Sequence, residues 1–79
     1  MNKPNNAMQA VKEACDKVGG QSALAGRLGV KPAFVYQWLR GLRPIPAKYC
    51  MAIERETGVS RVLLRPDDWR DFWPELSHV

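Results

Sequence analysis

The chain has 79 residues, 46% of them apolar, and a formal net charge of +4. A chain this short forms one domain, here residues 1–79, with a small core, because short chains bury a smaller share of their surface than long ones. The sequence has no run of about 18 apolar residues, which excludes a membrane-spanning helix on this pattern. Its start, MNKPNNAMQA, lacks the apolar segment of a signal peptide. We therefore expect a cytoplasmic protein that does not bind membranes.

Residue types that commonly hold metals or carry catalysis are sparse. Cys15 and Cys50 lie far apart, belong to no C-x-x-C pair and have no histidine nearby. We expect both to be reduced, buried thiols. The only histidine is His78, next to the last residue, where we expect it to be mobile. The sequence therefore predicts no metal site, no cofactor and no enzyme.

Charge is distributed unevenly along the chain. Between Lys17 and Ile53 there are six cations and no carboxylate, whereas from Met51 onward six acidic residues outnumber four basic ones. A basic surface attracts polyanions such as nucleic acids. The alternative interpretation is a solvated basic surface without a ligand. The pattern favours nucleic acid only if a motif supports it independently.

Apolar spacing predicts a series of helices. We expect them over residues 7–18, 21–28, 32–40 and 46–57, with a short fifth helix after Ser60. Glycine follows each of the first four segments, and glycine readily takes the left-handed conformation that ends a helix. Ser60 is suited to cap the fifth helix, with Val59 and Leu64 forming a hydrophobic staple. No segment alternates convincingly between polar and apolar residues, so the expected class is all-α.

The C-terminal segment RPDDWRDFWPELSHV contains three large aromatic residues. Trp69, Phe72 and Trp73 have helical spacing, an aspartate precedes them as a candidate cap, and Pro74 would end the helix after one or two turns. Exposing three such side chains to water is unfavourable. We therefore expect a short helical tail that covers either the core of this chain or that of another chain.

Two short helices joined by a glycine turn resemble the helix-turn-helix of phage repressors of the Cro and CI type. The matching positions are Leu24, Ala25, Leu28, Gly29, Val30, Val35 and Trp38. Ala25 must be small because the two helices cross there at close range, and Gly29 forms the turn.

The segment IPAKYCMAIERETGVSRVLLRPDDWRDFWPEL is similar to the tail of small prophage-encoded regulators, which include YdaS-like proteins, a family described as antitoxins. With the helix-turn-helix, this similarity covers nearly the whole chain. Together the two resemblances imply a compact five-helix, lambda-repressor-like domain with a short helical tail.

The resemblance to the phage helix-turn-helix implies that the second helix of the motif lies in the major groove of double-stranded DNA. The residues it places toward the bases are Lys31, Pro32, Ala33, Tyr36 and Gln37. Gln37 can pair with adenine, and Lys31 can donate to guanine. For Tyr36 the alternative is a half-buried ring with a solvated hydroxyl. We expect Phe34 to be partly buried, because it precedes Trp38 by one helical turn.

A second group of residues is expected at the phosphates: Gln21, Ser22, Arg27, Arg40, Arg43 and Lys48. Gln21 begins the first helix of the motif, where its amide and free backbone N–H groups can hold a phosphate. A plain polar cap is the alternative for Gln21. For Arg27, Arg43 and Lys48 the alternative is an exposed cation without a ligand.

A single reading head of this size buries little DNA surface, so we expect a homodimer on a palindromic operator. Two prolines interrupt any strand in the tail, so the interface should be helical. Its expected residues are Val62, Leu63, Trp69, Phe72, Trp73 and Leu76. The alternative is that the aromatic residues only close the monomer core.

The function expected from this pattern is that of a sequence-specific DNA-binding regulator, a Cro-like repressor of transcription. The alternative is an antitoxin that regulates its own operon and binds a toxin protein through its acidic, aromatic tail. A toxin gene next to this one would favour the antitoxin, whereas a divergent repressor gene would favour the Cro role.

Overall fold

Helices account for most of the chain in the computed structural model, which describes residues 6–77, the side chain of Asn6 excepted. His78 lies outside the described residues, so the expectation for it stays a prediction. The helices are α1 (Asn6–Val18), α2 (Gln21–Leu28), α3 (Pro32–Leu39), α4 (Ala47–Thr57), α5 (Arg61–Leu64) and α6 (Trp69–Phe72), followed by a 3-10 helix, η1 (Pro74–Ser77). Residues 6–77 contain no strand. The predicted all-α class is confirmed.

The turn between α2 and α3 depends on one glycine. Gly29 has φ 72°, a left-handed conformation that costs glycine little. The backbone N–H of Val30 then donates to the carbonyl of Ala25 at 3.0 Å, which closes the end of α2. Lys31 is extended, as a residue before proline must be, and Pro32 begins α3. The turn and the start of α3 are therefore set by local sequence.

The boundaries of the later helices agree with the prediction in part. The Ser60 hydroxyl accepts a hydrogen bond from the Val62 N–H at 3.1 Å, as expected of a cap. Asp68 precedes α6, but its side chain caps no backbone N–H of that helix. Helix α6 ends before Pro74, as expected, and Pro74 is also the first residue of η1. The predicted aspartate cap of α6 is therefore wrong.

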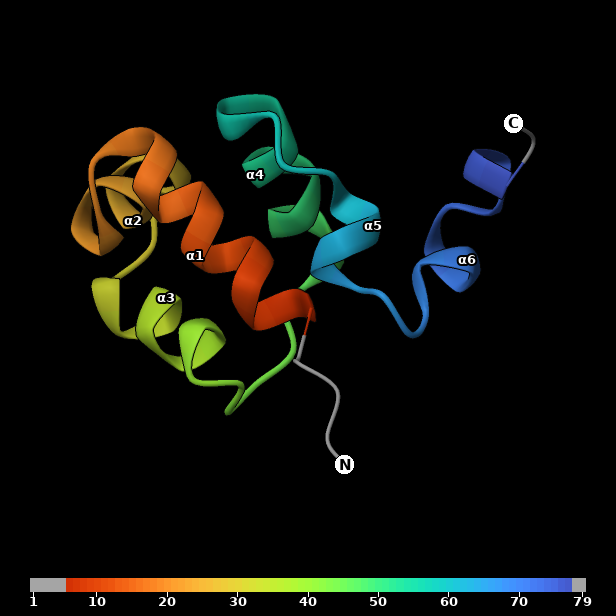
Figure 1. Cartoon of the computed structure of the whole chain (residues 1–79), viewed down its shortest axis with the longest axis horizontal. Coiled ribbons are helices and arrows are strands. Elements are labelled where there is room, and N and C mark those ends of the chain that lie inside the picture. Colours follow the sequence, from red (N-terminus) through yellow and green to blue (C-terminus); the bar gives the residue numbers. More distant parts are fainter. Residues whose placement is uncertain (1–5, 78–79) are drawn as a thin grey trace.

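Helix α1 crosses the centre of the molecule and contacts α2, α3, α4 and α5 (Figure 1). In that view α2 and α3 lie on one side of α1, whereas α6 lies at the opposite end of the molecule. The core is formed by buried side chains from α1 to α5, from the connections and from the tail: Ala10, Val11, Ala14, Cys15, Leu24, Ala25, Val35, Trp38, Ile45, Cys50, Ile53, Val59, Leu64 and Trp73.

The tail contributes to this core directly. Trp73 is only 5% exposed, and the guanidinium of Arg61 lies 5.3 Å from the centroid of its ring. Trp69 and Leu76 are partly buried against the same core. Phe72, in contrast, remains 46% exposed. Of the two alternatives for the aromatic tail, closure of the chain's own core therefore applies to Trp73.

Both cysteines are free and buried, which confirms the prediction of reduced thiols. Burial raises the pKa of Cys50 to about 12, and its thiol lies 3.6 Å from the carbonyl oxygen of Ile45. Burial also raises the pKa of Cys15. Because the thiolate is the reactive form, neither thiol is activated at neutral pH.

Candidate nucleic-acid interface

The orientation of α3 follows from two buried side chains on one of its faces. Val35 is fully buried, and Trp38 packs beneath it with its ring 5.7 Å from that of Tyr49 on α4. Side chains on the opposite face of a helix must then point away from the core. The residues exposed at the start of α3 and along it are Lys31, Pro32, Ala33, Phe34, Tyr36 and Arg40.

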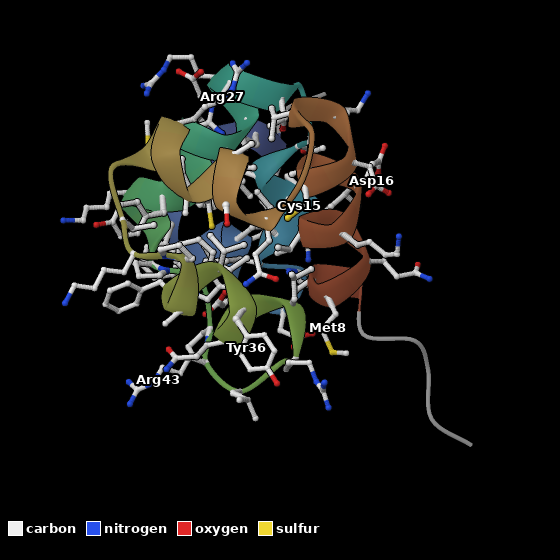
Figure 2. All side chains as sticks on the ribbon, turned by 90° about the vertical axis from the view of Figure 1, so that its left-hand side faces the viewer. Met8, Cys15, Asp16, Arg27, Tyr36 and Arg43 are labelled. Atoms are coloured by element: carbon white, nitrogen blue, oxygen red, sulfur yellow. The ribbon has the colours of Figure 1, made fainter. Side chains whose placement is uncertain are left out.

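Four of the five residues expected at the bases are therefore exposed: Lys31, Pro32, Ala33 and Tyr36. Tyr36 is 45% exposed, and the guanidinium of Arg40 lies 5.8 Å from its ring centroid. Figure 2 shows Tyr36 at the same end of the molecule as Arg43. Phe34 is also exposed, at 46%, so the expected partial burial against Trp38 underestimates its contact with solvent.

Gln37 differs from the other candidates for base contacts. Its side chain is half-buried, and its Oε1 atom is buried without a hydrogen-bond partner among the described residues. A bidentate contact with adenine uses both the oxygen and the nitrogen of the amide. The side chain must therefore rotate outward before it can make that contact. Because its Oε1 is unpaired, the rotation breaks no hydrogen bond of this atom.

The side chain of Gln21 makes a contact that neither interpretation anticipated. Its Nε2 donates to the carbonyl oxygen of Pro32 at 3.4 Å, so it links the first turn of α2 to the first turn of α3. Gln21 does not cap α2, which begins after Gly20 without a side-chain cap. Ser22 next to it is exposed. Gln21 thus helps to hold the start of α3 in place.

The expected phosphate-binding cations fall into two groups. Arg40, Arg43 and Lys48 are exposed, and the described residues give none of them an ion pair. Arg27 instead donates from Nη1 to Oε1 of Glu56 on α4 at 3.3 Å. Figure 2 places Arg27 at the end of the molecule opposite Arg43. Arg27 therefore connects α2 to α4 and is separated from the face that Tyr36 and Arg43 share.

Sequence reasoning missed Arg65, which joins three parts of the chain. Its Nε and Nη2 atoms donate to the two carboxylate oxygens of Asp68 at 2.9 and 2.7 Å, and its Nη1 donates to the carbonyl oxygen of Ile45. Its guanidinium also lies 4.7 Å from the ring centroid of Phe72. The hydrogen bonds from Arg65 lower the pKa of Asp68. The Arg-x-x-Asp spacing could have suggested this pair, but not the contact with Ile45.

A cavity of about 270 Å³ lies between the connection that follows α3 and the connection between α5 and α6. Gly41, Arg43 and Ile45 line it on one side, and Arg65 and Asp68 on the other. Residues 6–77 hold no group of three or more His, Cys, Asp or Glu side chains placed to bind a metal. None of the described helices is long and apolar enough to cross a membrane.

The fold and the exposed face of α3 define a small helix-turn-helix domain. The family model described as "Bacterial toxin YdaS" matches residues 11–72, and the chain belongs to this family. The YdaS-like resemblance is thus confirmed. This description names a toxin, whereas the resemblance seen in the sequence was to a family described as antitoxins, and the antitoxin function was the alternative to a repressor.

One curated relative is the "Putative transcriptional regulator YdaS" of Escherichia coli (strain K12). It is 56% identical over 62 residues, which cover 73% of this chain and 62% of the relative. The chain therefore spans less than two thirds of that protein's length. No solved structure matches the chain. The names of the family and of this relative point to a regulator or a toxin component rather than to an enzyme.

Proposed function

We propose that the chain is a sequence-specific DNA-binding regulator of transcription, and that it represses by occupying a palindromic operator as a homodimer. The observation that carries this proposal is the face of α3 opposite Val35 and Trp38. That face is exposed except at the half-buried Gln37, has a cation at each end in Lys31 and Arg40, and lies within a segment without carboxylates. DNA would meet no negative charge from α2, α3 or the turn between them.

The chemistry of this face fits the edges of base pairs in the major groove. Lys31, at the N-terminal end of α3, can donate to O6 and N7 of guanine. Pro32, Ala33 and Phe34 offer apolar surface to the methyl group of thymine. Gln37, once its amide has rotated outward, can pair with adenine. Base contacts of these kinds would give the protein its preference for one sequence.

The phosphates would bind the cations and amide groups around this face. Arg40 and Arg43 follow α3 directly, and Lys48 lies in the first turn of α4. Ser22 and the backbone at the start of α2 can hold a further phosphate. Such contacts fix the register of the protein on DNA without reading its sequence. Gln21 would support them by fixing the start of α3 through its bond to Pro32.

Dimerisation would use the exposed apolar side chains of α5 and the tail. Leu63 is 45% exposed and Phe72 is 46% exposed, and the half-buried side chains of Val62, Trp69 and Leu76 belong to the same elements. Trp73 would support this surface from inside the core. One reading head buries only about 600–1,000 Å² of protein surface on DNA. Two heads on half-sites roughly 34 Å apart would supply the remaining affinity.

Selection of bound sequences from a random DNA pool tests the proposal. We expect an enriched motif with two inverted half-sites, and we expect Lys31→Ala to lose the guanine preference within each half-site. Lys12→Ala is the matched control, because Lys12 is an exposed lysine of α1 that pairs with Asp16. Failure of the wild-type chain to enrich any sequence would overturn the proposal.

The antitoxin alternative has less support, because Trp73 of the tail is already buried in its own chain. The family description favours a toxin over an antitoxin. Growth of cells that express the chain separates these functions. Growth arrest that persists in a variant unable to bind DNA would favour a toxin that acts on another target, whereas arrest that disappears with DNA binding would follow from regulation.

A further inference from the structure

Arg65 and Asp68 line the same cavity as Arg43 and Ile45 of the connection after α3. Arg65 is the residue after α5, and its side chain is only 15% exposed. It contacts the tail through Asp68 and Phe72, and it contacts the connection between α3 and α4 through the carbonyl oxygen of Ile45. One partly buried guanidinium therefore joins the tail to the segment that follows α3.

We propose that Arg65, oriented by Asp68, is a positioning residue for DNA binding: it holds the connection after α3 so that Arg43 meets a DNA phosphate. This inference rests on the proposed function. It gives the tail an indirect role in DNA binding, because the tail holds Arg65 and Arg65 holds the connection that carries Arg43.

The connection has few backbone hydrogen bonds of its own. The Gly41 and Leu42 N–H groups donate to the carbonyls of Trp38 and Gln37, which ends α3. Prolines at 44 and 46 have no N–H to donate, so they cannot continue that pattern. The next backbone hydrogen bond along the chain begins α4, where the Tyr49 N–H donates to the carbonyl of Pro46 at 2.9 Å. Arg43 therefore lies in a short segment whose position depends mainly on the contacts of Ile45.

Ile45 is held in two ways. Its side chain is 2% exposed within the core, and its carbonyl oxygen accepts hydrogen bonds from Arg65 and from the thiol of Cys50. The bond from Arg65 is charge-assisted and therefore the stronger of the two. Because proline limits the rotation of the residues on both sides of Ile45, fixing this carbonyl also restricts the backbone at Arg43.

Asp68 gives the Arg65 side chain its direction. Both carboxylate oxygens accept from the guanidinium, a two-point contact that sets the plane of the group. The Phe72 ring lies against this plane at 4.7 Å. The third direction of the guanidinium then points to Ile45. Loss of Asp68 should therefore loosen the Ile45 contact without removing any side chain from the core.

The test combines Asp68→Asn with Arg43→Ala and measures DNA affinity over a salt series. A contact with one phosphate contributes about 0.9 to the slope of log affinity against log salt. We expect Arg43→Ala and Asp68→Asn each to lower the slope by about one per protomer, and so by about two for the dimer on its operator, and the double variant to lower it no further. Affinity between 50 and 200 mM salt would then change about fourfold less per protomer, or about twelvefold less for the dimer, than in the wild type.

Asp67→Asn is the matched control, since it removes the same charge from the neighbouring, exposed residue. Arg65→Lys is the second variant, because it keeps the charge but cannot form the two-point contact. We expect Arg65→Lys to resemble Asp68→Asn, and Asp67→Asn to keep the wild-type slope. A slope for Asp68→Asn equal to that of Asp67→Asn, with only a lower melting temperature, would show a purely structural role and overturn the proposal.

A second readout does not depend on DNA. Backbone order parameters from NMR should fall at Arg43 and Ile45 in Asp68→Asn, from about 0.85 toward 0.6, and stay unchanged in Asp67→Asn. Order retained at both residues would overturn the positioning role even if DNA binds. If order falls in Asp68→Asn but the wild-type chain binds no DNA, the proposed function and the phosphate contact of Arg43 are wrong. The contact between Arg65 and the connection would still be supported.

Discussion

Arginine and lysine side chains are exposed without an ion-pair partner in one region of the molecule and are paired with carboxylates in another. Around α3, Lys31, Arg40 and Arg43 are exposed, and the described residues supply no carboxylate to pair with them. Around α5 and the tail, Arg61 binds Glu54 at 3.0 Å and Arg65 binds Asp68 at 2.7 Å. Net charge alone does not distinguish these uses. The position of each carboxylate decides which cations are left for a partner.

The same comparison applies to the aromatic side chains. In the tail, Trp73 lies beneath the guanidinium of Arg61 and closes the core. On α3, Phe34 and Tyr36 project from a helix that already buries Val35 and Trp38. An aromatic residue that packs against its own chain contributes to stability, whereas one that remains exposed beside cations is available to a ligand. The following experiments test this division.

The largest expected effect belongs to the tail. Trp73→Ala removes a buried aromatic side chain and should lower the free energy of unfolding by about 3–5 kcal/mol. Leu63→Ala on the exposed side of α5 should change it by less than about 1 kcal/mol. Urea unfolding measures both values. Sedimentation that shifts in Trp73→Ala while its unfolding curve stays unchanged would place this ring at a dimer interface instead.

On the α3 side, Gln37→Ala should weaken binding by about 1–3 kcal/mol at one or two base positions only. The buried, unpaired Oε1 predicts in addition that the free protein is not destabilised by this substitution, because no hydrogen bond of that atom is lost. Affinities for a set of single-base operator variants measure the effect. An equal loss on every sequence would show that Gln37 does not read bases.

An acid titration tests the ion pair of the tail. The Arg65 guanidinium lowers the pKa of Asp68 below its ordinary value of 3.8, so the ionised carboxylate of Asp68 stabilises the folded state. The resulting stabilisation is complete above about pH 5 and is lost as the pH falls through the lowered pKa. Wild type should therefore exceed Asp68→Asn in stability by on the order of 1 kcal/mol at neutral pH, and the gap should shrink below about pH 4. A gap that does not change with pH would contradict this account.

The smallest effect concerns Phe34 and a single methyl group. Replacing a contacted thymine by uracil removes the methyl group, which is worth about 0.8 kcal/mol when buried. Wild type should lose about fourfold in affinity, and Phe34→Ala should lose nothing further on the uracil operator. Met51→Ala is the control, because that apolar side chain is similarly exposed, at 48%, but lies on α4. The same uracil effect in Phe34→Ala as in wild type would exclude the contact.

The fold was predictable because its boundaries depend on local chemistry. Gly29, Gly58 and the Ser60 cap act within a few residues of their own positions, so the sequence reveals them. The tail was harder to predict. Asp68 could serve as a cap or as an ion-pair partner, and only the location of Arg65 shows that it is the partner.

Part of the candidate site was beyond sequence reasoning. The outward residues of α3 followed from the resemblance to the phage helix-turn-helix, but Arg27 could not be separated from Arg43 by sequence, because its partner Glu56 is 29 residues away. The bond from Arg65 to Ile45 spans 20 residues in the same way. Such contacts depend on how helices pack, which periodicity does not describe.

The most direct test of the division between free and paired cations is the salt dependence of DNA binding in two arginine variants. Arg43→Ala removes a cation that the structure leaves exposed, and Arg27→Ala removes one that pairs with Glu56. We predict that Arg43→Ala lowers the salt slope by about one per protomer and that Arg27→Ala leaves it unchanged. Equal slopes in the two variants, or an affinity independent of salt in the wild type, would contradict the account.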